Sequence, residues 1–226
     1  MQKYTAGELA KFIDHTLLKA DATSKQIQTL CEEALKHHFF GVCVNSSFVS
    51  FCSQTLSGTG VHVVSVVGFP LGAMGSLAKA YEAEFAVNNG ASEVDMVLNL
   101  AAIKEKNYKN ATNDIQQVVK ASRGKIVKVI LETNLLTNEE KIAACQCSQE
   151  AGAHFVKTNT GFSGGGATLD DVLLMKKTVG SALQVKASGG IKNTQQALEY
   201  LNAGVSRLGT SSGIALIQGL DSAGGY

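Results

Sequence analysis

Two lysines lie in short segments that have the apolar alternation of buried strands. Lys157 belongs to residues 154–158 and Lys186 to residues 183–187, and each segment leads into a glycine-rich loop. A lysine in such a strand loses more hydration than it regains, so it is usually found at a strand edge with its ammonium in water. The alternative is a lysine kept in a pocket because its neutral amine is a nucleophile.

The presence of two such lysines favours the nucleophile, for a reason of acidity. A free lysine amine has a pKa near 10.4, so roughly one molecule in 2,500 is neutral at pH 7. Burial and a second ammonium nearby both lower that pKa, and a fall of about three units would raise the neutral fraction several hundredfold. Such an amine attacks a carbonyl to form a Schiff base, whose iminium helps to break the neighbouring carbon–carbon bond. Asp95, an aspartate in another predicted strand, is then a candidate proton relay through an ordered water.

Three loops rich in glycine and serine follow the predicted strands that contain or neighbour these lysines. They span residues 160–166, 188–191 and 209–213. Glycine and serine are also common in ordinary tight turns and helix caps. However, backbone N–H groups in such loops, together with a helix N-terminus, bind phosphate. Three such loops in succession indicate a phosphorylated substrate.

Strands and helices alternate along the chain, and this order must position the two lysines. The predicted strands are residues 13–18, 41–45, 61–67, 93–98, 126–131, 154–158, 183–187 and 206–209. The predicted helices that follow them are one introduced by residues 21–24, then 48–56, 76–88, 108–121, 138–151, 169–179, 193–202 and 211–218. Eight parallel strands separated by single helices predict a closed (β/α)8, or TIM, barrel. An open doubly wound sheet is the alternative, but no glycine fingerprint follows the first strand.

One domain over residues 1–226 is expected, with an additional N-terminal helix at residues 5–12 and a flexible, glycine-rich C-terminal tail at residues 219–226. The active site of such a barrel lies at the C-terminal ends of its strands. Asp14, Lys128 and Glu132 are therefore expected to lie near the two lysines and Asp95.

Composition excludes several classes of protein. A formal net charge of +1 and the absence of a long basic run argue against nucleic-acid binding. The apolar run at residues 61–69 is too short to span a membrane, and the first residues lack a signal-peptide core, so a cytoplasmic location is expected. Five scattered cysteines suit reduced thiols, and neither Cys145 and Cys147 nor the histidines form a metal-ligand pattern.

Eight segments together resemble the deoxyribose-phosphate aldolase family. The most specific are Phe-Val-Lys-Thr-Asn-Thr-Gly at residues 155–161 and Val-Lys-Ala-Ser-Gly-Gly at residues 185–190. The others are residues 12–18, 41–45, 67–72, 93–97, 128–133 and 207–212. The resemblance therefore extends from the first predicted helix to the last predicted strand.

This resemblance implies a role for each matching residue. Lys157 corresponds to the Schiff-base lysine, Lys186 to the second lysine that perturbs it, and Asp95 to the aspartate of the proton relay. The residues implied around that relay are Asp14, Thr16, Cys43, Lys128 and Thr160. Those implied for phosphate binding are Gly161, Gly189, Gly190, Ile191, Gly209, Ser211 and Ser212.

The implied reaction is the reversible cleavage of 2-deoxy-D-ribose 5-phosphate into acetaldehyde and D-glyceraldehyde 3-phosphate, in deoxyribose phosphate catabolism. It needs no metal ion and no organic cofactor, and its partners are sugar phosphates and aldehydes. A homo-oligomer, in the first place a dimer, is expected. Some members of this family end in a tyrosine that assists proton transfer, a role that Tyr226 could take.

Two other functions remain open from the residues alone. A phosphate-binding barrel isomerase or epimerase would need the glycine loops but no covalent lysine. A sensor that keeps the sugar-phosphate pocket without catalysis would need neither lysine. Cys43 is either a reactive thiol near the pocket or, as is more common, a small buried hydrophobe.

Overall fold

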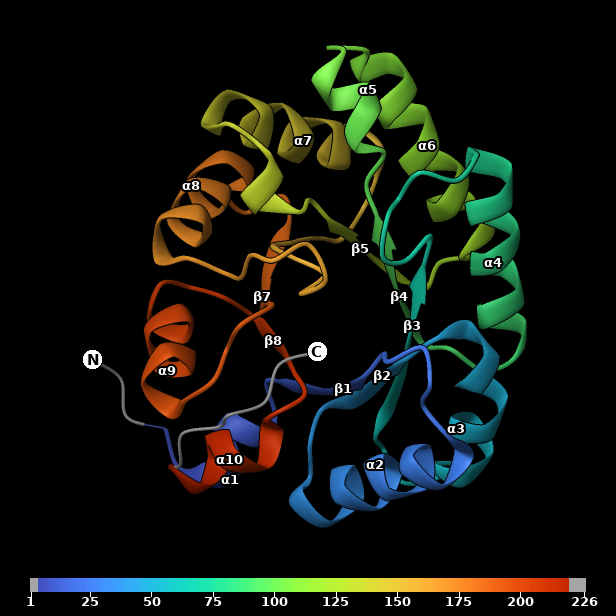
Figure 1. The fold of residues 1–226 in the computed structure, drawn as a ribbon, viewed down its shortest axis with the longest axis vertical. Coiled ribbons are helices and arrows are strands. Elements are labelled where there is room, and N and C mark those ends of the chain that lie inside the picture. Colours follow the sequence, from blue (N-terminus) through green and yellow to red (C-terminus); the bar gives the residue numbers. More distant parts are fainter. Residues whose placement is uncertain (1–3, 220–226) are drawn as a thin grey trace.

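Eight parallel strands close into a barrel in the part of the chain that the computed structural model describes, residues 4–219 (Figure 1). They pair in sequence order, and the last strand pairs with the first, which closes the sheet. The predicted (β/α)8 barrel is therefore confirmed. The strands are β1 Ile13–Leu17, β2 Gly41–Val44, β3 His62–Val67, β4 Glu93–Val97, β5 Ile126–Ile130, β6 Phe155–Lys157, β7 Gln184–Ser188 and β8 Arg207–Thr210.

Helices surround the strands on the outside of the barrel (Figure 1). They are α1 Ala6–Ala10, α2 Ser24–His37, α3 Val49–Thr55, α4 Ser76–Asn88, α5 Leu100–Lys104, α6 Tyr108–Ala121, α7 Asn138–Glu150, α8 Leu169–Val179, α9 Thr194–Asn202 and α10 Gly213–Gln218. Two short 3-10 helices accompany them, η1 Ser46–Phe48 and η2 Thr133–Leu135. The predicted limits of α4, α6 and α8 agree with the structure.

The additional N-terminal helix is α1, which packs beside α10 (Figure 1). Thr5 caps it, because the Thr5 side chain accepts a hydrogen bond from the Glu8 backbone and Glu8 binds back to Thr5. Helix α5 was not predicted. It has one turn and a half, too little for an apolar period to be recognised, and Asn99 caps it through the backbone N–H of Ala102.

Most of the other predicted limits differ from the structure by one or two residues, and two of these elements bear on how the chain is arranged. The predicted helix at residues 48–56 is divided into η1 and α3, where the chain changes from a 3-10 to an α turn. Strand β6 has three residues and is shorter than predicted. Thr158, just beyond it, still binds β7, because its backbone N–H donates to the Lys186 carbonyl and its hydroxyl donates to the Ser188 carbonyl.

Strand alternation separates an apolar layer from a largely charged interior. Side chains that point outward, such as Val94, Val129 and Val185, are fully buried between the sheet and the helices. Inside the barrel, Val64 and Val66 belong to a small apolar cluster on one side. Barrel interiors are normally filled by branched apolar side chains, so the buried charges on the other side of this interior call for an explanation.

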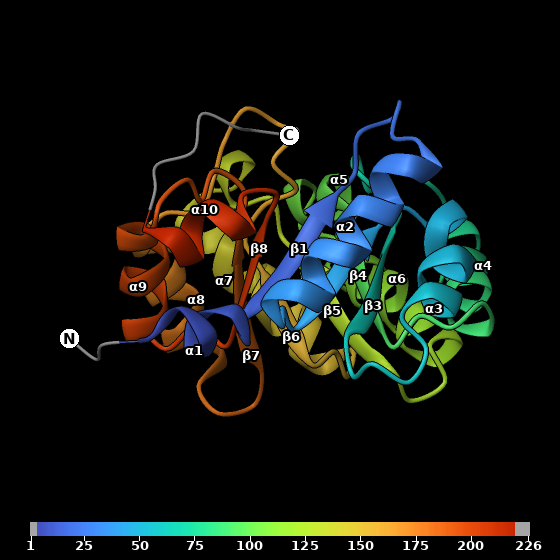
Figure 2. The ribbon, with the colours of Figure 1, turned by 90° about the horizontal axis from the view of Figure 1, so that it is seen from below.

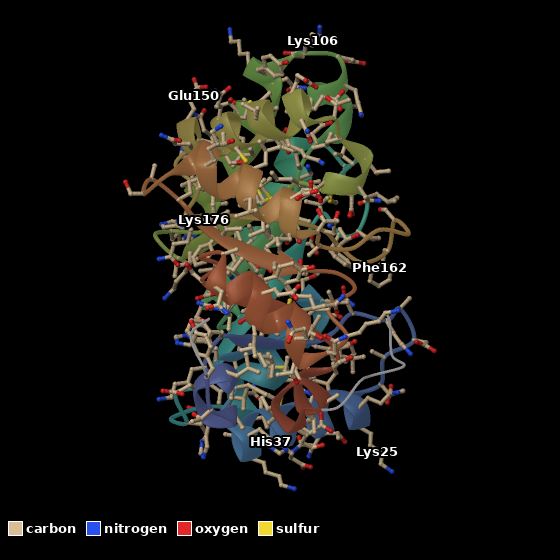
Figure 3. All side chains as sticks on the ribbon, turned by 90° about the vertical axis from the view of Figure 1, so that its left-hand side faces the viewer. Lys25, His37, Lys106, Glu150, Phe162 and Lys176 are labelled. Atoms are coloured by element: carbon tan, nitrogen blue, oxygen red, sulfur yellow. The ribbon has the colours of Figure 1, made fainter. Side chains whose placement is uncertain are left out.

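The C-terminal ends of the strands open toward loops on one face of the barrel, as the direction of β1 shows (Figure 2). Two of these loops contact each other through a pair of aromatic rings. Phe69, after β3, meets Phe162, after β6, edge to face with ring centroids 5.1 Å apart. Phe162 protrudes from its loop at the edge of the molecule (Figure 3) and is 42% exposed, so this pair lies at the mouth of the barrel.

Candidate active site

Asp95 lies at the centre of a cluster of buried ionisable side chains inside the barrel. Its Oδ1 accepts a hydrogen bond from Lys128 Nζ at 2.8 Å, and its Oδ2 accepts from Lys157 Nζ at 2.7 Å and Lys186 Nζ at 2.8 Å. Lys186 also forms an ion pair with Asp14. Strands β1, β4, β5, β6 and β7 each supply one of these side chains, and their register turns all of them inward.

Lys157 differs from Lys186 in the carboxylates that it contacts. Lys186 pairs with Asp14 in addition to Asp95. Within residues 4–219, Lys157 pairs only with Asp95, and it uses the same oxygen as Lys186. Lys157 is 4% exposed whereas Lys186 is fully buried, so Lys157 is the more accessible amine.

These contacts and burial shift the pKa values of Lys157 and Lys186 in opposite directions. Burial lowers the pKa of Lys157, and although Asp95 raises it, the Lys186 ammonium lowers it again, so the pKa stays below the ordinary value. Burial also acts to lower the pKa of Lys186, but Asp14 and Asp95 reverse this and raise it above the ordinary value. Burial acts to raise the pKa of Asp95, yet the three lysines around it hold that pKa well below its usual range. Of Lys157 and Lys186, Lys157 is therefore the lysine that releases its proton more readily.

Thr16 and Cys43 point into the barrel from paired positions on β1 and β2. The Thr16 hydroxyl donates a hydrogen bond to the Asp14 carbonyl at 2.8 Å. Cys43 packs against Val64 and Val66, and burial, with a contribution from Asp95, raises the pKa of its thiol to about 11. A thiol that keeps its proton at neutral pH is unreactive, which favours Cys43 as a small buried hydrophobe.

Thr160 is fixed by Glu132, which follows β5. The Glu132 carboxylate accepts hydrogen bonds from the Thr160 backbone N–H at 3.2 Å and from the Thr160 hydroxyl, and both residues are buried. Glu132 has a φ of 55°, which is uncommon for a residue with a side chain and occurs where the surroundings enforce it. The pair ties the end of β5 to the segment between Lys157 and the glycine loop.

The glycine-rich loops after β6 and β7 pack against each other and line a pocket of about 480 Å³. A Cβ on Gly166 would lie 2.8 Å from the Gly189 carbonyl oxygen, so this close approach requires glycine. Lys192 adds a cation to a surface made mostly of backbone, a combination that suits an anion such as phosphate. The lining residues are Gly161, Gly164, Gly165, Gly166, Gly190, Lys192 and Gln196.

The remaining residues implied for phosphate are not part of the lining of this pocket. Gly189 packs closely against Gly166, which does line the pocket. Ile191 is buried among apolar side chains, and Ser211 is exposed beside a neighbouring hollow that Thr16 also lines. Ser212 is the residue before α10 and lies at the N-cap position of that helix.

Of the two remaining predicted site residues, the structure places Gly209 inside the barrel and does not describe Tyr226. A Cβ on Gly209 would lie 3.0 Å from Lys186 Cε, so glycine at this position leaves room for the lysine inside the barrel. Tyr226, and the predicted tail except its first residue, lie outside the described residues 4–219.

Three further charged residues were not predicted for the site. Glu93 and Arg207 are buried inside the barrel and join the ion pairs around Asp14 and Lys128. Alternation could have found Glu93, because it lies two residues before Asp95 in the same strand and so faces the same side. The third is Lys192, which follows the predicted loop at residues 188–191.

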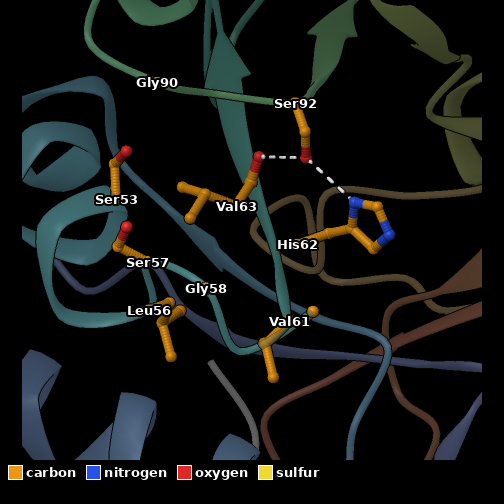
Figure 4. Close-up of a pocket in the computed structure, with 10 residues that line it drawn as sticks. Ser53, Leu56, Ser57, Gly58, Val61, His62, Val63, Gly90 and Ser92 are labelled. Carbon is orange, nitrogen blue, oxygen red and sulfur yellow. Dashed lines mark hydrogen bonds between the residues drawn. The ribbon is translucent and has the colours of Figure 1, made fainter.

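A separate pocket of about 280 Å³ lies at the N-terminal ends of β3 and β4, away from the loops that follow the strands (Figure 4). It is lined by turns before β3 and β4 and by the end of α3. His62 Nδ1 lies 3.3 Å from Ser92 Oγ, which in turn donates to the Val63 carbonyl. His62 is the only ionisable residue that lines this pocket in the described structure, and the buried charges around Asp95 lie elsewhere.

The described part of the chain has neither a cluster of metal-ligating side chains nor a helix that could cross a membrane. Among residues 4–219, no three His, Cys, Asp or Glu side chains gather in a way that could hold a metal ion. None of the helices in this range combines the length and the apolar character that crossing a bilayer requires.

Comparison with known proteins shows the family to which this chain belongs. A model of the DeoC/LacD family aldolases matches residues 9–219. The chain is 55% identical over 219 residues to the deoxyribose-phosphate aldolase of Bdellovibrio bacteriovorus, and the match covers 97% of this chain and 100% of that one. It is 54% identical over 226 residues to the deoxyribose-phosphate aldolase of Carboxydothermus hydrogenoformans, and that match covers 98% of this chain and 99% of the other. The tetrameric deoxyribose phosphate aldolase of Aeropyrum pernix has a TM-score of 0.89 at 31% identity, covering 95% of this chain and 91% of that one. The chain therefore belongs to the DeoC/LacD aldolase family.

Proposed function

We propose that this chain is a class I aldolase that reversibly cleaves 2-deoxy-D-ribose 5-phosphate into acetaldehyde and D-glyceraldehyde 3-phosphate, with Lys157 as its nucleophile. One observation supports the nucleophile above all others. Lys157 contacts a carboxylate oxygen that already binds the Lys186 ammonium, so the neutral form of Lys157 is favoured. The relatives of Bdellovibrio and Carboxydothermus are named for this substrate, which supports the same substrate here.

The reaction begins when the Lys157 amine attacks the aldehyde carbon of the open-chain sugar. The carbinolamine that forms loses water and becomes an iminium. Asp95 Oδ2 accepts hydrogen bonds from both Lys157 and Lys186, so it can pass a proton between the two nitrogen atoms. Lys186, which is held as an ammonium, is the donor that can assist the loss of water.

The iminium then draws electrons from the bond between C2 and C3 of the sugar. The C3 hydroxyl loses its proton, the C2–C3 bond breaks, and D-glyceraldehyde 3-phosphate leaves. The C2 carbon of the enamine takes up a proton, and water then releases acetaldehyde and returns the Lys157 amine. The relay proposed for these proton transfers consists of Asp95 and an ordered water, with Asp14, Thr16 and Lys128 around it.

The glycine pocket is the proposed phosphate site. Lys192 and the backbone of Gly161 and Gly190 line it, and α9 begins directly after this segment. Binding energy from the phosphate would hold C1 of the sugar near Lys157, which accelerates the attack by positioning.

Trapping of the Schiff base tests this function. Acetaldehyde followed by borohydride should add an ethyl group of about 28 Da to one lysine. Peptide mapping is expected to place it on Lys157, and a label on Lys186 or Lys128 would contradict the assignment. A phosphate-binding isomerase, an epimerase or a sensor would give no label, and the cleavage assay with 2-deoxy-D-ribose 5-phosphate would then show no acetaldehyde.

We also propose that the chain forms a homodimer through the outer face of α4. Leu77, Tyr81 and Phe85 recur at four-residue intervals on that face, and the first two are 77% and 71% exposed. Leu71 and Met74 extend this stripe along the preceding loop. Five large side chains exposed to this degree leave roughly 500 Å² of apolar surface, a large part of the ~800 Å² that each partner buries in a stable interface.

The molar mass in solution tests the dimer. Light scattering should give twice the mass of the chain, and Tyr81→Glu should reduce it to that of a monomer because a charge would be buried at the centre of the contact. Tyr108→Glu, which changes an exposed tyrosine on another helix, is the control and should remain dimeric. A dimer that persists in Tyr81→Glu and Leu77→Glu would place the interface elsewhere.

A single domain and a cytoplasmic location complete the proposal. The described residues form one closed barrel, and the buried Cys31, Cys43, Cys52, Cys145 and Cys147 are all free thiols. Free thiols suit a reducing compartment. Cell fractionation with detection of the intact chain is the corresponding measurement.

A further inference from the structure

The charged side chains inside the barrel form a closed ring of ion pairs. Lys128 contacts Glu93 and Asp95, and Lys186 contacts Asp14 and Asp95. Arg207 closes the ring, because its Nη1 lies 3.0 Å from both Asp14 Oδ1 and Glu93 Oε2. In order, the members of this interior ring are Asp95, Lys128, Glu93, Arg207, Asp14 and Lys186.

Three carboxylates alternate with three cations in the interior ring, so the ring is neutral without Lys157. Lys157 is joined to it only at Asp95, among the contacts of the described residues. A proton on Lys157 would therefore leave one positive charge without its own carboxylate in a buried space, which is unfavourable. The balance of the ring, and not only the nearest ammonium, disfavours protonation of Lys157.

Glu93 and Arg207 are the first residues of β4 and β8, so they lie at the N-terminal end of the barrel interior, away from the loops where substrate enters. The Arg207 guanidinium stacks on Phe40, with Cζ 3.2 Å from the ring centroid, and Phe155 lies on another side at 5.8 Å. Both charged residues are buried, and Arg207 is 6% exposed. Neither contacts Lys157. Glu93 is connected to it through Lys128 and Asp95, and Arg207 is connected to it through Asp14, Lys186 and Asp95.

We propose that Glu93 and Arg207 are positioning residues that keep the interior ring closed and neutral, and thereby keep Lys157 unprotonated for attack. This inference rests on the proposed role of Lys157 as nucleophile. Arginine suits the position because its guanidinium stays charged at any working pH, whereas a lysine there could lose its own proton instead.

Other ionisable groups lie near Lys157 and near Arg207 and could contribute to the pH dependence of adduct formation. Those facing Lys157 are Asp95 from β4, Lys186 from β7 and Cys43 from β2. Lys128 from β5 contacts Asp95, and Asp14 from β1 contacts Lys186. Those around Arg207 are Asp14 and Glu93, with His62 on the far side of Phe40. Lys128 and Lys186 each contact two carboxylates, so Lys157 is the cation with the fewest.

Removal and restoration of the charge balance test the proposal. Arg207→Met removes one positive charge, so a proton on Lys157 becomes balanced and its pKa rises. The pH at which the acetaldehyde adduct forms at half its maximal rate should move up by about one unit or more, with a roughly tenfold loss of rate at neutral pH for each unit. Adding Glu93→Gln to Arg207→Met removes the matching negative charge and should move that midpoint back down. A role of Arg207 in packing alone would not be repaired by a second change.

Arg207→Lys keeps the charge and should keep the midpoint closer to that of the wild type than Arg207→Met does. Lys79→Met, which removes a buried charge outside the barrel, is the matched control and should not move it. An unchanged midpoint in Arg207→Met, or a raised midpoint that Glu93→Gln fails to lower, would overturn the proposal. If Arg207→Met does not fold, Arg207→Gln removes the same charge and takes its place. Absence of any adduct on Lys157 in the wild type would instead overturn the proposed function.

Discussion

Lys79 and Lys157 are both buried lysines that contact an aspartate, but they lie in different layers of the molecule. Lys79 lies between α4 and α6, where its Nζ is 2.7 Å from Asp114 Oδ2 and 2.9 Å from the Val97 carbonyl oxygen. Lys157 lies inside the barrel and shares Asp95 with other cations. Burial lowers the pKa of both lysines.

The number of carboxylates available to each lysine makes the difference. Lys79 does not share Asp114 with another cation among the described residues, so its positive charge is balanced, and Nζ also donates to the Val97 carbonyl oxygen. Lys157 is the fourth cation in a space with three carboxylates, so its proton is not balanced. Burial alone therefore does not make a lysine a nucleophile. Lys157 is suited to that role because it shares its one carboxylate with other cations and lies close to the mouth of the barrel.

The largest effect is expected from Lys157→Met. Turnover should fall by at least about four orders of magnitude, because the group that forms the covalent bond is gone. The free energy of unfolding should not decrease, since the variant removes an amine whose proton has no carboxylate of its own. A steady-state assay of cleavage and a denaturant titration measure the two quantities. Turnover within tenfold of the wild type would show that another group is the nucleophile.

Lys186→Leu should have the next largest effect. It removes the ammonium that lowers the pKa of Lys157, so that pKa rises and the neutral amine is populated only at higher pH. The alkaline optimum should move up, with about tenfold loss of rate at pH 7 for each unit of the rise. The pH profile of kcat/KM measures this. A full rate at pH 7 with an unchanged profile would show that Lys186 does not control the pKa of Lys157.

Lys79→Met should affect stability and leave the chemistry unchanged. It leaves Asp114 buried without a cation, which destabilises by about 3–5 kcal/mol. The double variant Lys79→Met/Asp114→Leu should recover most of that loss, because both charges are gone. Denaturant titrations of the two variants give the energies. A change in the pH profile of cleavage in Lys79→Met would mean that the two lysines are not independent.

Lys192→Ala should raise KM for the phosphorylated sugar by about tenfold, since a charge-assisted contact to the anion is lost. KM for unphosphorylated 2-deoxyribose should not change, which makes that sugar the control. Lys177→Ala, on α8 and outside the pocket lining, is a matched control for the loss of a lysine. Equal effects of Lys192→Ala on both sugars would move the phosphate site away from the glycine pocket.

The smallest effect is expected from Tyr226→Phe, which removes only the hydroxyl. If this phenol assists protonation of the enamine carbon, turnover should fall severalfold with little change in KM. Exchange of the acetaldehyde methyl protons into deuterated water should slow in parallel. Unchanged turnover and exchange would mean that Tyr226 has no part in the reaction.

The barrel could be predicted because each strand and most helices have a local signal. The apolar run of β3 and the Thr5 capping box are examples. Lys157, Lys186 and Asp95 could be predicted because charged residues within buried strands are unusual. Arg207 was not predicted for the site, since its partners, Asp14 and Glu93, lie far away in sequence and only the closed barrel brings them together. Lys192 was missed because an exposed lysine after a glycine turn has no local feature that marks it.

Whether Lys157 is neutral at working pH can be measured on the protein itself. NMR of the chain labelled with ¹³C at lysine Cε, with the Lys157→Met spectrum to assign the signal, follows this amine through a pH titration. Lys157 should titrate clearly below the ordinary lysine value of about 10.4, while Lys186 should keep its proton throughout. A Lys157 signal that titrates at or above the ordinary value would contradict it.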